Sequence, residues 1–130
     1  MPHQGNWQDV NIPLAGDFFN AALRPVQTGR HASSVLAKQN PLFEIANPLL
    51  RFSAIKRAED GNSFVVRLYN PTSRKQKGDL KFAAELCNAW VTNLNEEREH
   101  KLSVKGNTIS ITAEPHKIVT LAIEPQHRMV

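Results

Sequence analysis

The second half of the sequence alternates apolar and polar residues, and this alternation is the feature that most constrains the fold. A period of two puts one face of a strand against a core and the other face toward water. The runs with this pattern, or with the apolar and β-branched composition of strands, cover residues 50–56, 63–69, 79–86, 89–94, 102–104, 108–112 and 117–123. No helix-length amphipathic segment competes with them in this half of the chain. Short strands at close spacing predict an all-β fold, an antiparallel β-sandwich.

Turns rich in glycine and asparagine separate two pairs of these runs. The segment 59–62 has the composition of a hairpin turn, and so does the pair at 106–107. In the second hairpin we expect Val104, Ile109 and Ile111 on the apolar face. The segment 95–100 is strongly charged, which predicts a connection between strands.

The first 45 residues lack this regularity and predict an irregular N-terminal segment. Residues 18–24 are compatible with a short helix or a strand, and residues 27–40 with a loop or an insertion. A chain of 130 residues has the size of one domain. We therefore expect a single domain over 1–130, with a lead-in at 1–45 and the main strands at 46–125.

The net charge of +4 is local, because the stretch 67–81 contains the whole excess of basic residues. Residues 71–79 within it are polar and rich in turn formers, which predicts a solvated hairpin loop. The alternative is a phosphate-binding role for Arg74, Lys75 and Lys77. No aromatic residues alternate with these cations to stack on bases, so we expect no nucleic-acid partner.

The motifs of common catalytic sites are missing from the sequence. It has no G-x-S-x-G elbow, P-loop or G-x-G-x-x-G, so acyl transfer, nucleotide hydrolysis and dinucleotide redox chemistry have no support. The histidines, none at the spacing of zinc ligands, are His3, His31, His100, His116 and His127. The single cysteine, Cys87, follows Leu86 in an apolar run and is expected to be buried. We therefore expect no catalytic residue, metal site or cofactor in this chain.

Signals for export or membrane insertion are also missing. The first residues lack a basic stretch followed by an apolar one, and no apolar run approaches the ~20 residues that span a membrane. A lone cysteine forms no internal disulfide, which fits a reducing compartment. We expect a cytoplasmic protein with no membrane partner.

Several blocks of the sequence carry a family resemblance. The blocks are 65–72 (VVRLYNPT), 90–97 (WVTNLNEE), 109–111 (ISI) and 115–121 (PHKIVTL), preceded by 2–7 (PHQGNW) and 19–23 (FNAAL). Their order and spacing resemble the C-terminal β-domain of glycoside hydrolase family 38, the α-mannosidases. The bacterial branch, which includes mannosylglycerate hydrolases, is the most similar.

The resemblance implies a role inside a larger enzyme. Members of the family are zinc-dependent retaining α-mannosidases, whose nucleophilic aspartate and metal ligands lie in an N-terminal α/β domain. This chain has no counterpart of that domain, so no catalytic residue carries over and we expect the chain alone to be inactive. The expected partners are the catalytic and middle domains. The chain would be the terminal sandwich of a longer enzyme, expressed separately, or the product of a truncated or split gene.

A domain of this kind could still contribute to the rim of a sugar site. The candidates are polar residues after the expected strand 89–94 whose groups can hydrogen-bond sugar hydroxyls: Asn93, Asn95, Glu96 and Glu97. An alternative function is a stand-alone carbohydrate-binding module with Trp7, Tyr69 or Trp90 as stacking platforms. A further alternative is an assembly module that pairs through exposed strand edges.

Overall fold

The computed structural model describes residues 2, 4–7, 10–21, 24–27, 29, 41–59, 61 and 63–126. The chain divides into two units, Met1–Ser34 and Val35–Val130. Three of the histidines, His3, His31 and His127, and most of the expected loop at 27–40 lie outside the described residues. Among the residues described, no helix has the length and apolar character needed to cross a membrane.

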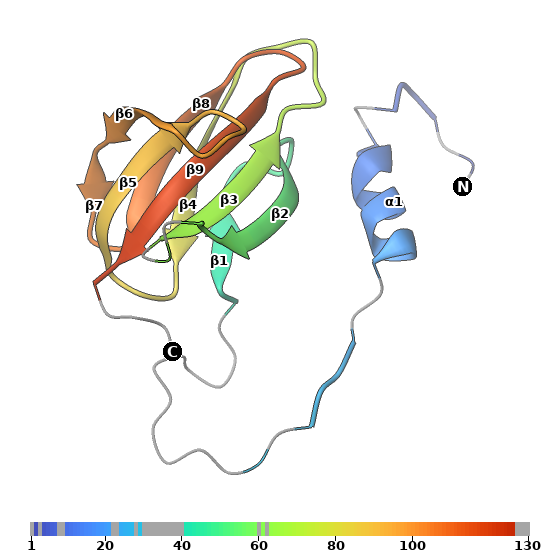
Figure 1. The fold of residues 1–130 in the computed structure, drawn as a ribbon. Helices are drawn as coiled ribbons and strands as arrows, with labels where there is room; N and C mark the ends of the chain where they lie inside the picture. The colour runs from blue at the N-terminus through green and yellow to red at the C-terminus, as the bar shows by residue number, and fades with distance from the viewer. Residues whose placement is uncertain are drawn as a thin grey trace. The chain divides into compact units, whose positions relative to one another are not determined.

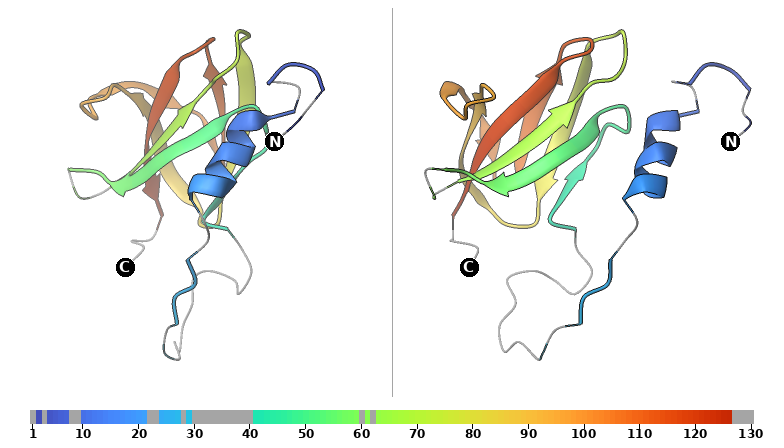
Figure 2. Two further views of the ribbon diagram at one scale, coloured as in Figure 1. Left: turned by 90° about the vertical axis from the view of Figure 1, so that its right-hand side faces the viewer. Right: turned by 45° about the vertical axis from the view of Figure 1, so that its right-hand side comes forward.

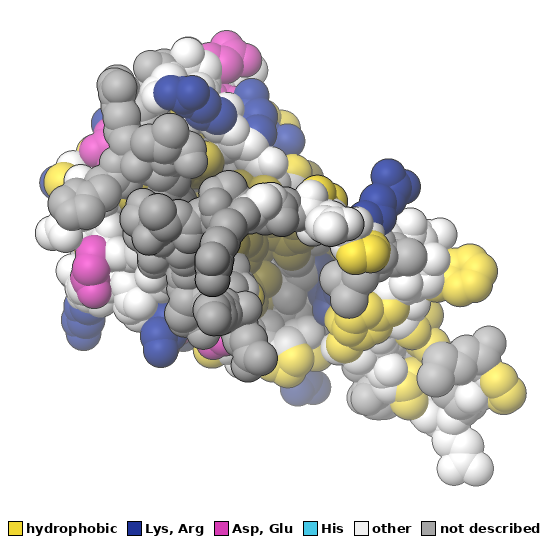
Figure 3. Space-filling model, turned by 90° about the horizontal axis from the view of Figure 1, so that it is seen from below, with side chains coloured by type: hydrophobic (Ala, Val, Ile, Leu, Met, Phe, Trp, Pro, Cys, Tyr) yellow, Lys and Arg dark blue, Asp and Glu magenta, His cyan; other side chains and the backbone are white. Residues whose placement is uncertain are grey.

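The described residues of the first unit form one helix, α1 (Ile12–Asn20). It follows Asn11, whose φ is 50°, and has a proline in its first turn, a position that proline favours. The helix starts earlier than the segment 18–24 that the sequence suggested. None of its residues is buried, and Phe18 and Phe19 are 73% and 88% exposed. Figure 3 shows hydrophobic side chains gathered on the surface of this unit.

The second unit is built from strands in two sheets (Figures 1 and 2). The strands are β1 (Phe43–Ile45), β2 (Arg51–Arg57), β3 (Phe64–Tyr69), β4 (Gln76–Phe82), β5 (Leu86–Thr92), β6 (Arg98–Leu102), β7 (Val104–Lys105), β8 (Thr108–Ala113) and β9 (Ile118–Pro125). The four-stranded sheet has the order β1-β4-β8-β7 and the five-stranded sheet the order β2-β3-β9-β5-β6. All neighbouring strands are antiparallel, which confirms the predicted antiparallel β-sandwich.

The core lies between the two sheets and follows the alternation of the sequence. Its buried members include Val66, Leu68, Leu121 and Ile123 from the five-stranded sheet and Leu80, Phe82, Ile109 and Ile111 from the four-stranded sheet. The hairpin at 106–107 is confirmed, since β7 pairs with β8 and Val104 packs against the core beside them. The intervening residues of β3 and β9 face outward on the five-stranded sheet.

The basic segment is not the hairpin loop that the sequence predicted. β3 and β4 belong to different sheets, so the residues between them cross from one layer to the other. β4 already begins at Gln76, which places Lys77 in a strand. Thr72, inside the crossing segment, is 5% exposed.

Two further expectations were wrong. The charged segment 95–100 is not a connection throughout its length. Its second half belongs to β6, which begins at Arg98 and pairs with β5. Cys87 is exposed and not buried, since the register of β5 against β9 shifts between Leu86 and Asn88. A shift of this kind leaves one residue unpaired and turns its side chain out of the regular alternation.

Asn70 holds the crossing segment in place from a position that is 1% exposed. Its Nδ2 donates to the carbonyl oxygens of Arg74 (2.7 Å), Ala113 (3.1 Å) and Glu114 (3.0 Å). Its Oδ1 accepts from both the backbone N–H and the hydroxyl of Thr72, at 3.0 and 2.8 Å. One amide therefore satisfies backbone groups of two crossings, β3–β4 and β8–β9, which lie side by side in Figure 1.

We expect Asn70→Ala to lower the free energy of unfolding by about 2–4 kcal/mol, because buried carbonyl and N–H groups lose their partners. Urea denaturation of the full chain measures this. The matched control is Asn20→Ala, since the Asn20 amide donates only to an exposed carbonyl within α1 and should change stability by less than about 0.5 kcal/mol. Equal effects of the two substitutions would contradict the anchoring role of Asn70.

Candidate functional site

The four residues predicted for the sugar-site rim lie together in the loop between β5 and β6. Asn93 organises this loop: its Oδ1 accepts from the backbone N–H groups of Asn95 (2.9 Å) and Glu97 (3.0 Å). Its Nδ2 donates to the Glu97 carboxylate at 2.5 Å. Such a side-chain-to-backbone turn is typical of asparagine. The Asn93 and Glu97 side chains thus bond each other within the loop.

Glu96 ties the loop to the opposite edge of the five-stranded sheet. Its carboxylate bonds the Lys56 Nζ of β2 at 2.5 Å and accepts from the Glu59 backbone N–H at 3.1 Å. Only 14% of the Glu96 side chain is exposed. Glu96 also has a φ of 69°, a conformation that costs free energy for any residue other than glycine. The two contacts therefore offset the strain in the loop.

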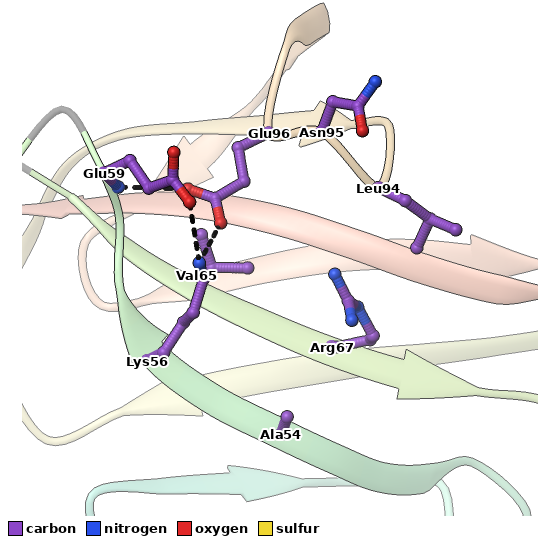
Figure 4. A pocket seen from close by; sticks show the side chains of 8 residues that line it. All are labelled: Ala54, Lys56, Glu59, Val65, Arg67, Leu94, Asn95 and Glu96. Atoms are coloured by element: carbon purple, nitrogen blue, oxygen red, sulfur yellow. Dashed lines mark hydrogen bonds and ion pairs between the residues drawn. The ribbon is translucent and has the colours of Figure 1, made fainter.

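The loop and the sheet enclose a hollow of about 400 Å³, shown in Figure 4. Its lining consists of Ala54, Lys56, Glu59, Val65, Arg67, Leu94, Asn95 and Glu96. Of the predicted rim residues, Asn95 and Glu96 therefore line it, while Asn93 and Glu97 do not. The Asn95 side chain is exposed and points away from the ion pair in Figure 4.

Sequence reasoning missed Lys56 and Arg67, which come from β2 and β3. A signal for Arg67 was present, since it interrupts an apolar run between Val66 and Leu68. On a strand without exposed residues, such as β3, a charged residue marks a specific polar environment on the outward face.

The electrostatics of the loop follow from the Lys56–Glu96 contact. The hydrogen bond from Lys56 lowers the pKa of the Glu96 carboxyl below its ordinary 4.5, with further lowering by the Glu59 N–H and by the charge of Arg67. The same hydrogen bond raises the pKa of Lys56 above its ordinary 10.5. Both groups are therefore charged at neutral pH.

The three aromatic residues that could stack on a sugar differ in how far their rings are exposed. Trp90 is half-buried on the outward face of β5, and the Arg98 guanidinium lies 3.9 Å from its ring centre. Arg98 also bonds the Glu124 carboxylate at 2.8 Å, so this cation is held over the ring. Tyr69 is half-buried, and Trp7 belongs to the first unit, where it is 42% exposed.

The residues predicted for phosphate binding do not share one loop. Arg74 and Lys75 lie in the crossing segment and Lys77 lies in β4. Lys75 forms an ion pair with Glu114 at 2.5 Å. Among the described residues, no three His, Cys, Asp or Glu side chains are close enough to hold a metal ion.

We expect Lys56→Met to return the pKa of Glu96 toward its ordinary value, because the main cause of its lowering is removed. A lowered folded-state pKa means that the pair stabilises the loop at neutral pH and that this contribution is lost as the pH falls through the folded pKa. A carbon-13 NMR titration of the Glu96 carboxyl measures its pKa in the unsubstituted chain and in Lys56→Met. Lys105→Met, at an exposed lysine of β7, should leave the titration unchanged, and an unshifted Glu96 in Lys56→Met would refute the assignment.

The family is shown by comparison with known sequences. Residues 49–121, more than half of the chain, match the family described as "Glycosyl hydrolases family 38 C-terminal beta sandwich domain". The match runs from the turn before β2 into β9 and includes the whole β5–β6 loop. A search of curated proteins gave no match. The chain belongs to the C-terminal β-sandwich domains of glycosyl hydrolase family 38.

Proposed function

We propose that the chain is the non-catalytic C-terminal domain of an α-mannosidase-like enzyme of the bacterial branch, which includes mannosylglycerate hydrolases. The parent enzyme hydrolyses α-mannosides with retention and uses zinc held by its N-terminal α/β domain. The sandwich supports the catalytic and middle domains of that enzyme. The family match over 49–121 is the observation that supports this proposal.

The β5–β6 loop forms part of the rim of the sugar site in this proposal. Asn95 presents an exposed amide beside the hollow, and a primary amide can both donate to and accept from sugar hydroxyls. Asn93 and Glu97 hold the loop in shape, and Glu96 fixes it to β2. A preorganised loop loses little conformational entropy when it binds.

A stand-alone sugar-binding module receives less support. Such a module needs an aromatic ring with an open face, and Arg98 covers the ring of Trp90. Tyr69, the other aromatic candidate of the sandwich, is half-buried.

The test of the rim uses the enzyme that contains this domain. Asn95→Ala should raise KM for an α-mannoside about twofold to tenfold, the equivalent of one neutral hydrogen bond of about 0.5–1.5 kcal/mol. The melting temperature should not change, because the Asn95 side chain is exposed. Asn20→Ala, another exposed asparagine, is the control. Unchanged KM and kcat in Asn95→Ala would remove this residue from the sugar site.

We also expect the 130-residue chain alone not to hydrolyse p-nitrophenyl α-mannoside, with or without added zinc. Release of p-nitrophenol measures this. Zinc-dependent turnover by the purified chain would overturn the non-catalytic assignment.

A further inference from the structure

On the outward face of the five-stranded sheet, Arg67 is a cation for which the described residues provide no hydrogen-bond or ion-pair partner. It is half-buried in β3, one strand away from the centre of the sheet. Its Nε atom is inaccessible to water and has no hydrogen-bond partner in the described part of the chain. A buried donor without an acceptor costs free energy, so such a group calls for an explanation, such as a bound molecule.

The nearest carboxylates do not serve as that partner. Glu96 is held by the Lys56 ammonium and by the Glu59 N–H. The Glu59 carboxylate lies 3.7 Å from the same ammonium and is 88% exposed. In Figure 4 both carboxylates point to Lys56, while the Arg67 guanidinium points into the hollow between Leu94 and Glu96. Lys56 therefore takes both acidic side chains and leaves the guanidinium fork free.

A second unsatisfied polar atom lies in the same row of the sheet. Arg67 pairs across the strands with Thr120, which in turn pairs with Thr92. Thr92 is 4% exposed, and its hydroxyl oxygen is buried without a partner within the described residues. Thr92 and Thr120 line a second hollow of about 540 Å³, and Leu94 lines both hollows. Each of the two hollows that Leu94 lines therefore has, in its lining, a residue with a buried polar atom that lacks a hydrogen-bond partner among the described residues: Arg67 in the first and Thr92 in the second.

The geometry points to a binding site at Arg67 for a small organic carboxylate. A guanidinium presents two parallel N–H donors that match two oxygens of a carboxylate or of a phosphate. A carboxylate carries one negative charge, which a single guanidinium neutralises, whereas a phosphate group carries about −1.5 to −2 at pH 7 and would need a second cation. Chloride offers no pair of oxygens to the two donors. The hollow of about 400 Å³ lies at the small end of ligand sites, and Ala54, Val65 and Leu94 provide apolar contacts for a short carbon chain. This inference goes beyond the proposed function, because it requires only this chain and a carboxylate.

The experiment is a titration of the full chain with sodium acetate at pH 7, at constant ionic strength set by sodium chloride. The proton–nitrogen NMR signal of the Arg67 Nε–H group belongs to the same guanidinium and reports an acetate ion bound to it. We expect a saturable shift with a dissociation constant on the order of millimolar, as suits a single ion pair at a half-open site. The backbone amides of Leu94, Asn95 and Glu96 should move with the same constant.

Three variants and one competing anion decide the outcome. Arg67→Gln should weaken acetate binding at least tenfold, and Arg67→Lys, which keeps the charge and loses the fork, should weaken it as well. Arg57→Gln should bind acetate normally, since the Arg57 guanidinium already donates to the Gly61 carbonyl.

A linear, non-saturating shift, or acetate binding retained in Arg67→Gln, would overturn the site. Equal affinity for inorganic phosphate would overturn the carboxylate specificity. If Arg67→Gln does not fold, the Nε–H titration of the native chain and the Arg67→Lys comparison still give the answer.

Discussion

The sandwich depends on a buried amide, that of Asn70, at one of the points where the chain changes sheets. The backbone between β3 and β4 must leave one ladder before it enters the other, so its polar groups lose their regular partners. Asn70 replaces those partners and also reaches the carbonyls of the β8–β9 connection. Because β9 pairs with β3 and β8 pairs with β4, this amide joins two connections that each cross between the sheets.

The pleat of β3 determines which of its residues lie on the outward face of the five-stranded sheet. With Val66 and Leu68 directed into the core, Val65 and Arg67 must face outward on the same strand. Val65 is nevertheless 2% exposed, so this face is covered by the chain's own side chains and by the β5–β6 loop. The site is therefore a consequence of the fold: a loop lies over a sheet face on which a charged residue alternates with a buried one.

The sequence predicts the elements better than their connections. A strand such as β8 carries an alternation that reflects its own burial, so a local pattern reveals it. β6 has mostly exposed residues, Arg98 to Lys101, and a strand with little burial leaves no such pattern. The change of sheet after Asn70 depends on bonds to residues more than forty positions away, which no local pattern contains. The same holds for the candidate site. The sequence could predict that residues 93–97 lie together, because they are contiguous. Lys56 and Arg67 lie far from these residues in the sequence and are brought close together by the pairing of β2 with β3.

The charges around the outward face explain why Arg67 in particular remains free. On one side Lys56 engages Glu96, and on the other Arg98 engages Glu124 while it lies over Trp90. In both pairs the carboxylate is the more buried partner, since 14% of the Glu96 side chain and 22% of the Glu124 side chain are exposed, against 50% for Lys56 and 38% for Arg98. Within the described part of the chain, both carboxylates are therefore already bound to a cation other than Arg67. An external carboxylate at the Arg67 guanidinium would displace no hydrogen bond that this side chain makes to a described residue.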